Sequence, residues 1–504
     1  MLLKIELGQA GLDKWRQLDT LVSKLPAANI SSFGRHLMTI AHISDTHVCD
    51  SQSPARLPFT DRYGDPHHPF ADEIGGPVGN YRAQEMLTTQ VLDAAVQKIN
   101  TLTGRYAEQP ISLTVITGDV TDNAQINELA WAKKLLEGGF VRPNSGAKKV
   151  FEGPGGEPFD SNYWNPEHAD VLDSPKLFYG FPTVPGLLDA AMSSFEASGL
   201  RMPFIAVHGN HDELLQGTVA VNSELRWRAT SDKYPVRLVQ DQLFFSLAER
   251  FAPIGPAAWP DPADLEFAHC TPDADRAIMP PVEWEMAFGN PKHNVIEHQG
   301  FIFVSLNTVN PHGGWDGSLD RPQLYWLEQT LLQFHDRPVI LLSHHPLERL
   351  KNDYSPLGST DRVCSEELEE FFSKFSNIVA WLAGHEHRNT LSRVGKENGF
   401  WLIETCSLID WPQEGRVIEF FEDDEDLVIA ITMFSHDSPI SVLSGKRLAK
   451  GFDLSENLVL ASLSRQVAAN DWQRQTGDTS VQNMEGNANA RNVVLRHPKG
   501  NLRL

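Results

Sequence analysis

The chain has 504 residues, of which 41% are hydrophobic and 22% charged, so a globular fold is expected, as one elaborated domain or two to three ordinary ones. Its formal net charge of −23 repels polyanions at long range, which disfavours a nucleic-acid polymer as partner. No apolar run approaches the roughly 18 residues of a membrane helix. We therefore expect no membrane partner, and a homo-oligomer stays open.

The N-terminus lacks the plan of a signal peptide, because charged and apolar residues alternate throughout residues 1–25. The four cysteines are scattered without a C-x-x-C pair, which is typical of reduced thiols. These features predict a cytoplasmic protein, although an exported form stays open. Cys49 is interpreted either as a minor metal ligand or as a small apolar residue beside a strand end.

Six short apolar, β-branched runs predict strands buried on both faces, and each ends at a cluster rich in His, Asp or Gly. The runs are residues 37–43, 111–117, 204–207, 301–306, 339–342 and 378–382. Helical periodicity lies between them, at residues 83–100, 127–136 and 322–334. This alternation predicts an α/β core with functional groups at the carboxyl ends of its strands.

Three long segments interrupt this alternation, at residues 49–79, 138–181 and 252–290. They are rich in Pro, Gly, Asp and aromatic residues, and loops of this length are usually functional in a compact domain. The first follows a candidate ligand directly and is expected to border the site. The middle one is interpreted either as a binding loop or as surface decoration.

The C-terminal part begins with two apolar runs, residues 417–421 and 427–433, which predict a hairpin with an acidic tip. Residues 457–470 have helical periodicity, and residues 473–490 are rich in Gly, Asn and Gln, which predicts a flexible tail. We therefore divide the chain into three parts. They are an N-terminal extension (1–37), a domain with the three insertions (38–437), and a partly helical C-terminal extension with a flexible tail (438–504).

Seven residues of metal-ligand type stand at the ends of the predicted strands. They are Asp45, His47, Asp119, Asn210, His344, His385 and His387. Side chains two apart on an extended chain share a face, and a carboxylate can bridge two cations about 3.5–4 Å apart. Each motif alone has an ordinary interpretation, such as a turn or a buried hydrogen-bonded Asp. Five motifs in one order favour a binuclear site, and this donor set suits Mn, Zn or Fe better than Mg or Ca.

Two further residues follow Asn210 directly and are predicted to be catalytic. His211 can donate a proton or a hydrogen bond to a leaving-group oxygen. Asp212 is expected to orient His211 and to raise its pKa by charge pairing.

The motifs D-x-H, G-D, G-N-H-[DE], a single His and G-H-x-H together resemble the calcineurin-like metallophosphoesterase superfamily, over about residues 38–410. The resemblance implies a four-layer α/β/β/α sandwich of two mixed sheets with long loop insertions. It also implies one metal held by Asp45, His47, Asp119 and His387, and another held by Asp119, Asn210, His344 and His385. In this pattern His345 is not a ligand.

Other positions narrow the resemblance. Asp122 and His47 stand where purple acid phosphatases of the superfamily carry Tyr and Gly, which argues against an iron-tyrosinate enzyme. Residues 81–85, 271–276 and 411–413 look like a long-chain bacterial subfamily without an assigned substrate.

The implied activity is that of a phosphoric ester hydrolase, with water attacking phosphorus in line while two cations neutralise the phosphoryl oxygens. We favour a phosphodiesterase acting on small-molecule or cyclic-nucleotide-type esters. A phosphomonoesterase for nucleotide or sugar phosphates is the alternative, and a non-catalytic metal-binding regulatory protein is an alternative of another class. Candidate recognition residues in the long loops, each also interpretable as an ordinary loop residue, are Arg62, Tyr63, His67, His68, Asn80 and Arg276.

Overall fold

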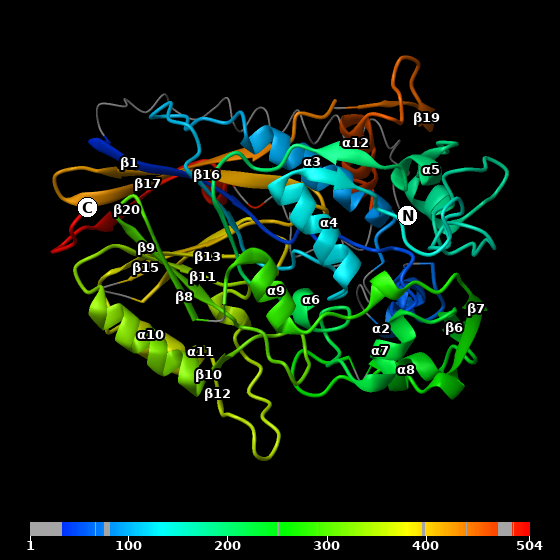
Figure 1. Cartoon of the computed structure of the whole chain (residues 1–504), viewed down its shortest axis with the longest axis horizontal. Helices are drawn as coiled ribbons and strands as arrows, with labels where there is room; N and C mark the ends of the chain where they lie inside the picture. Colours follow the sequence, from blue (N-terminus) through cyan, green and yellow to red (C-terminus); the bar gives the residue numbers. More distant parts are fainter. Residues whose placement is uncertain are drawn as a thin grey trace.

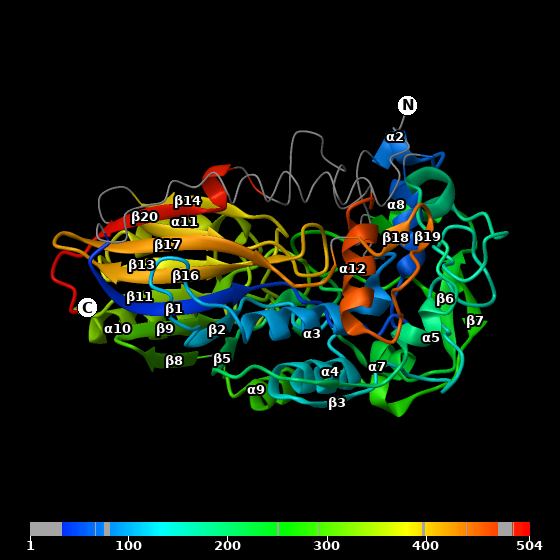
Figure 2. The ribbon, with the colours of Figure 1, turned by 90° about the horizontal axis from the view of Figure 1, so that it is seen from above.

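The computed structural model describes residues 33–65, 67–74, 81–248, 251–291, 293–395, 399–439, 441–471, 486 and 488–504. The predictions for residues 1–32, for Asn80 and for most of the segment 473–490 lie outside these residues. Two six-stranded sheets face one another with helices on their outer faces (Figures 1 and 2). The predicted four-layer α/β/β/α sandwich is confirmed.

The first sheet has the strand order β20-β17-β16-β1-β2-β5. Its strands are β1 (Arg35–Ile43), β2 (Leu113–Ile116), β5 (Phe204–Ala206), β16 (Glu414–Glu422), β17 (Asp426–Ser435) and β20 (Val493–Pro498). β1, β2 and β5 are parallel, whereas the pairs β1–β16, β16–β17 and β17–β20 are antiparallel. The carboxyl ends of β1, β2 and β5 therefore meet at one edge of the sheet.

The second sheet has the order β14-β15-β13-β11-β9-β8. Its strands are β8 (His293–His298), β9 (Phe301–Leu306), β11 (Val339–Leu342), β13 (Ile378–Ala383), β14 (Thr390–Val394) and β15 (Phe400–Glu404). The four central strands are parallel and the two outer strands antiparallel to them. The sequence predicted β9, β11 and β13, but not β8, β14 or β15.

The space between the sheets is an apolar core to which both sheets contribute alternate residues. On β1, Met38 and Ile40 face this core, while Ala41 and Ile43 face the helices outside. Strands of the second sheet alternate in the same way between the inner core and the core under α10 and α11. The two-residue period of a strand produces this division. It also fixes the register in which the strand ends reach the site.

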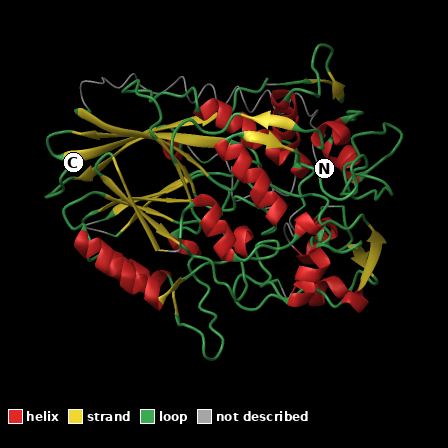
Figure 3. Cartoon of the chain, in the orientation of Figure 1, coloured by secondary structure: helices red, strands yellow, loops and turns green. Residues whose placement is uncertain are grey.

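Five helices cover the outer faces, and Figures 1 and 3 show them on both sides of the sandwich. The first sheet is covered by α3 (Thr88–Ile99), α4 (Ile126–Glu137) and α12 (Asn457–Ala468), and the second by α10 (Arg321–Gln333) and α11 (Ser365–Phe372). α10 begins after Asp320, whose side chain accepts the backbone N–H of Gln323, as an N-cap does. α12 packs against α3, and β20 closes the first sheet, so both contact the predicted domain 38–437. The division of the chain into domain and extensions stays a prediction.

Shorter elements come mainly from the long segments between the sheet strands. They are α2 (Ala71–Ile74), β3 (Gly139–Val141), α5 (Leu187–Ala191), β4 (Phe195–Ala197), α6 (Asn210–Glu213), α7 (Ser223–Ala229), β6 (Lys233–Leu238), α8 (Leu243–Ala248), β7 (Leu265–His269), α9 (Pro281–Phe288), β10 (Leu319–Asp320), β12 (Arg362–Val363), β18 (Leu443–Ser444) and β19 (Arg447–Leu448). Residues 252–290 include β7, α9 and the buried Trp284. Most of these elements lie at the end of the molecule away from β20 and the C-terminus (Figure 1). In the described part of the chain, no helix has both the length and the apolarity needed to cross a bilayer.

Candidate metal centre

Five strand-end loops carry the seven predicted ligands to one place. Asp45 and His47 follow β1, Asp119 follows β2, and Asn210 follows β5. His344 follows β11, and the pair His385 and His387 follows β13. The first two loops are joined through their backbones, since the N–H of Asp45 donates to the Gly118 carbonyl at 3.1 Å and that of His47 to the Asp119 carbonyl at 2.8 Å.

The backbone at this place has an unusual conformation. The described chain has ten non-glycine residues with positive φ, and five of them are predicted ligands: Asp45, His47, Asp119, His385 and His387, with φ between 38° and 75°. Such residues cost about 1–3 kcal/mol each and cluster at functional sites, where the surrounding structure holds them. The strain therefore supports a functional role for these loops.

A glycine allows two of these loops to touch. Gly118 has φ +89°, and a Cβ placed there would lie 2.5 Å from Nδ1 of His344. Any larger residue would clash with the His344 side chain. The G-D motif thus needs its glycine both for its backbone conformation and for close approach to the second sheet.

Around Asp45, side chains from three loops present their ligand atoms to one another. Nε2 of His387 lies 3.2 Å from Oδ1 of Asp45 and 3.3 Å from Nε2 of His47. Nε2 of His47 lies 3.6 Å from Oδ2 of Asp119. Asp45, His47 and His387 form one of the groups whose ligand atoms all lie within 4.8 Å of one another.

Asp119 and His385, two of the remaining predicted ligands, lie beside His344. Nε2 of His344 lies 3.3 Å from Oδ2 of Asp119 and 3.2 Å from Nδ1 of His385. Asn210 donates its Nδ2–H to the Gly217 carbonyl at 2.9 Å, while its buried Oδ1 has no hydrogen-bond partner among the described residues. An unsatisfied buried acceptor is costly, and a metal ion is one way to satisfy it. The buried His47 and His344, the half-buried His385 and His387, the carboxylates and this amide oxygen fit a transition-metal pair.

Hydrogen bonds orient three of the imidazoles. Nδ1–H of His47 donates to Oδ1 of Asp122 at 2.9 Å, and Nδ1–H of His387 to Oδ2 of Asp410 at 2.5 Å. Nδ1–H of His344 donates to the Thr117 carbonyl at 2.8 Å. In each case the bond fixes the tautomer and leaves the Nε2 lone pair for a metal.

Burial and opposite charges shift the pKa values of the site in opposing directions. Burial alone would raise the pKa of Asp119, but the imidazoles of His344 and His211 hold it well below its usual range. Burial lowers the pKa of His344, yet Asp119 raises it to about 9. Asp45 similarly outweighs burial and raises the pKa of His387 to about 9. Asp119 with His344, and Asp45 with His387, thus favour each other's charged forms. Burial instead dominates at His47, whose pKa it lowers to about 4, and at His385, whose pKa it lowers well below the usual value.

The expected pairing of Asp212 with the His211 ring is corrected by the structure. The carboxylate of Asp212 instead accepts the backbone N–H groups of Val120, Thr121 and Gly209, at 3.2, 2.8 and 2.9 Å. Through the N–H groups of Val120 and Thr121, Asp212 therefore stabilises the loop that carries Asp119. Residues adjacent on a helical turn such as α6 do not face each other, which explains the difference.

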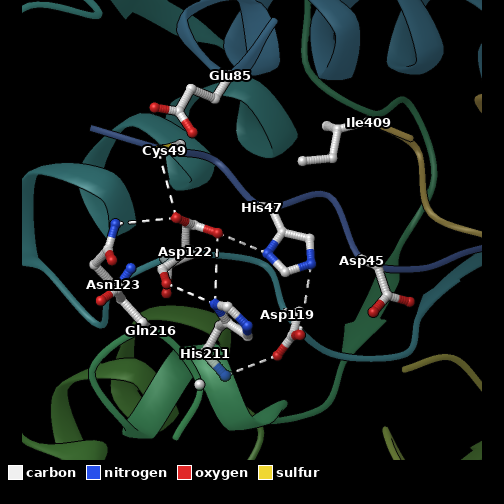
Figure 4. A network of polar contacts seen from close by, with 12 residues as sticks. Asp45, His47, Cys49, Glu85, Asp119, Asp122, Asn123, His211, Gln216 and Ile409 are labelled. Atoms are coloured by element: carbon white, nitrogen blue, oxygen red, sulfur yellow. Dashed lines mark hydrogen bonds and ion pairs between the residues drawn. The ribbon is translucent and has the colours of Figure 1, made fainter. Parts of the chain in front are cut away.

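Asp122 holds the His211 ring through a hydrogen bond. Nδ1–H of His211 donates to the backbone carbonyl of Asp122 at 2.8 Å, and the Asp122 carboxylate lies 3.5 Å away. Figure 4 shows Asp122 between His47 and His211. The backbone N–H of His211 donates to Oδ1 of Asp119 at 2.9 Å. His211 is thus fixed from both ends beside the predicted ligands.

Two nearby residues are engaged elsewhere. Nε2–H of His345 donates to the Trp315 carbonyl at 2.9 Å, and its Nδ1 lies 2.8 Å from the Thr308 hydroxyl. Both ring nitrogens of His345 are therefore occupied, in agreement with His344 as the ligand of this motif. The buried thiol of Cys49 donates to Oδ2 of Asp122 at 3.4 Å, and burial raises its pKa well above the usual value.

The candidate recognition residues of the long loops are mostly bound within the protein. Arg62 pairs with Asp160 at 2.7 Å, and the Tyr63 hydroxyl donates to Asp241. His67 stacks on Phe178, and His68 packs against Tyr63 and Phe70. Arg276 is fully buried and donates to Ser145.

Sequence reasoning missed three residues behind the site: Arg82, Asp122 and Asp410. In the sequence, Asp122 stands out only as the position where purple acid phosphatases carry Tyr, and Arg82 lies in the segment 81–85 that resembles a subfamily. Asp410 immediately precedes another such segment, 411–413. The resemblance of these segments to a subfamily is the sequence signal that could have revealed the residues. In the structure Asp410 accepts a hydrogen bond from His387, and Arg82 donates one to Asp410.

The chain is similar to a known protein family and to one curated protein. Residues 170–389 match the family model described as calcineurin-like phosphoesterase. A probable glycerophosphodiester phosphodiesterase GpdQ from Arcobacter nitrofigilis is 31% identical over 72 residues, which are 14% of this chain. The match covers only 26% of the length of that relative.

Among solved structures, a dimetal phosphatase from Danio rerio covers 80% of this chain and 100% of its own, with 13% identity and a TM-score of 0.33. A likeness this distant does not bear on the site. The family match does, because it includes the loops of Asn210, His344, His385 and His387. Residues 170–389 of the chain are therefore similar to the calcineurin-like phosphoesterase family.

Proposed function

We propose that the protein hydrolyses phosphoester bonds with two transition-metal cations and acts on small phosphodiesters. The observation that carries this proposal is the convergence of seven donors from five strand-end loops, one of them the unpartnered Oδ1 of Asn210. Imidazole, carboxylate and amide donors in one buried cluster suit Mn, Zn or Fe.

One cation would be held by Asp45, His47, Asp119 and His387, and the other by Asp119, Asn210, His344 and His385. When bound, the two cations supply positive charge that polarises the ester and activates water. The protein supplies the geometry, since its backbone and the partners of the imidazoles hold the donors in place.

His211 is the proposed acid for the leaving-group oxygen. The Asp122 carbonyl holds the ring through Nδ1–H at 2.8 Å, so Nε2 is the nitrogen available to a substrate. The backbone N–H of His211 donates to Oδ1 of Asp119 at 2.9 Å. This hydrogen bond places the proposed acid next to the carboxylate that would bind both cations. Asp122, rather than Asp212, orients the ring.

The preference for a diester is supported by the relative whose name includes glycerophosphodiester phosphodiesterase. Because the match to this relative covers only 72 residues, the choice between diester and monoester substrates is tested by experiment. Phosphomonoesters of nucleotides or sugars, and binding without turnover, are the other outcomes of the test.

The test uses the full chain stripped of metal and reloaded with Mn, Zn or Fe. The substrates are bis-p-nitrophenyl phosphate, p-nitrophenyl phosphate and cyclic AMP. We expect turnover only after reloading, with the highest kcat/KM on a diester. Higher kcat/KM on p-nitrophenyl phosphate would replace the diester proposal with a monoesterase.

His211→Ala is the matched variant for the acid. We expect it to keep both cations and to lose about 10²–10⁴-fold in turnover, the usual contribution of a general acid. Wild-type protein that binds two cations and hydrolyses none of the esters would instead indicate a metal-binding protein without catalysis.

A further inference from the structure

A buried arginine lies behind one half of the proposed metal centre. Arg82, in the turn before α3, is only 3% exposed. Its Nε–H donates to Oδ1 of Asp410 at 2.8 Å, and its Nη1 lies 3.9 Å from Oδ1 of Asp122. One guanidinium therefore faces two buried carboxylates that come from distant parts of the chain.

Each of these carboxylates holds an imidazole of the metal centre. Oδ2 of Asp410 accepts from His387 at 2.5 Å, and Oδ1 of Asp122 accepts from His47 at 2.9 Å. Both imidazoles are proposed ligands of the same cation, and their Nε2 atoms lie 3.3 Å apart. Arg82 thus reaches His387 through the hydrogen-bonded carboxylate of Asp410. It reaches His47 through the carboxylate of Asp122, which also has Nη2 of Arg56 at 3.6 Å.

The other half of the centre is held differently. His344 donates its Nδ1–H to the Thr117 carbonyl, and Asn210 donates its amide to the Gly217 carbonyl. These acceptors are neutral backbone groups, so neither bond depends on a buried charge. A change at Arg82 should therefore affect the two halves unequally.

The chemistry of a guanidinium suits this position. Its planar donors can bind two carboxylates at once, and it stays charged when buried. Removing one partner from a buried charge network leaves the other charges uncompensated, which is strongly unfavourable. Lysine would keep the charge but not the two directions of donation.

We propose that Arg82 is a positioning residue that sets the affinity of one cation only, the one held by Asp45, His47 and His387, through its hydrogen bond to Asp410 and its charge beside Asp122. This inference rests on the proposed function for the assignment of ligands to that cation. It concerns metal binding, so it is tested without turnover.

The experiment loads the full-length protein with Mn(II) and measures stoichiometry, the two affinities and the electron paramagnetic resonance spectrum. For wild type we expect two ions with the spectrum of a coupled pair. Arg82→Gln should weaken one ion by about 10–100-fold, the usual effect of losing an outer-sphere partner, and leave the other unchanged. The affinity of Arg82→Lys for this ion should lie between those of wild type and Arg82→Gln.

Reference variants identify which ion is lost. With one ion bound, the spectrum of Arg82→Gln should match that of His387→Ala and differ from that of Asn210→Ala. Arg491→Gln is the control for loss of a buried arginine, since Arg491 is 1% exposed and binds Glu414 through two contacts of 2.7 and 2.8 Å. We expect this control to lower the unfolding temperature and to keep both affinities.

Wild-type affinity for both ions in Arg82→Gln would overturn the proposal. An equal loss of both ions, as general destabilisation would cause, would also overturn it. If Arg82→Gln does not fold, Asp410→Asn tests the same connection and should weaken the same ion. Two ions bound without ester hydrolysis would refute the proposed function alone, whereas fewer than two ions in wild type would refute both.

Discussion

The two halves of the candidate metal centre are held by different kinds of groups. Behind His47 and His387 stand the ionised side chains of Asp122, Asp410 and Arg82. Behind His344 and Asn210 stand backbone carbonyls at 2.8 and 2.9 Å. The Thr117 carbonyl directly follows β2, so the sheet itself positions it, whereas the charged half depends on side chains that mutation can change one by one.

The largest expected effect belongs to the residue shared by both halves. Oδ2 of Asp119 lies 3.6 Å from Nε2 of His47 and 3.3 Å from Nε2 of His344. We expect Asp119→Ala to lose both cations and at least about 10³-fold in turnover, because cationic stabilisation of the reaction is worth several kcal/mol. Metal content by mass spectrometry, together with kcat, measures the effect. Retention of one tightly bound cation would show that the two halves do not share this carboxylate.

Asp122→Asn is expected to weaken the charged half while sparing the acid. The amide loses the charge that faces His47, but the backbone carbonyl that holds His211 remains. We predict about 10–100-fold weaker binding of one cation, with most of kcat recovered at saturating metal. Metal titrations of activity test this. A kcat that stays low at saturating metal would mean that the Asp122 carboxylate also serves the acid.

A chelator should remove the two cations of the proposed centre one after the other. The half that includes Asp45 and Asp119 has two carboxylates, whereas the half that includes Asn210 has one and a neutral amide, so the second should release its cation first. Each cation at about 100 times its Kd adds about 2.7 kcal/mol to the free energy of unfolding. Thermal unfolding during a chelator titration should therefore fall in two steps. Simultaneous release would erase the predicted difference between the halves.

The smallest effect on chemistry is expected at Asp212. Asp212→Asn replaces an acceptor of three backbone N–H groups, at a cost of about 1–3 kcal/mol in the free energy of unfolding. Turnover per folded molecule should change little, because Asp212 contacts neither the His211 ring nor the ligand atoms in the described hydrogen bonds. Denaturant unfolding and kcat test this together. A loss of kcat as large as that of His211→Ala would restore Asp212 as a catalytic group.

Much of the fold could be predicted because its signals are local. The apolar runs of β1, β9, β11 and β13 are short and end at polar motifs, so their boundaries were visible in the sequence. β8, β14 and β20 were not predicted, because they are edge strands whose pairing depends on a neighbour rather than on their own pattern.

By itself, the sequence predicted the two-sheet α/β architecture and the seven candidate metal ligands, since each candidate lies within a few residues of an apolar strand. Only the tertiary structure decided what holds those ligands. Arg82 and Asp410 are 328 positions apart and meet through a side-chain hydrogen bond. Asp122, rather than the sequence neighbour Asp212, faces His211. Contacts of this kind depend on chain folding, because adjacent residues on a turn point apart while distant strand ends meet at one edge of a sheet.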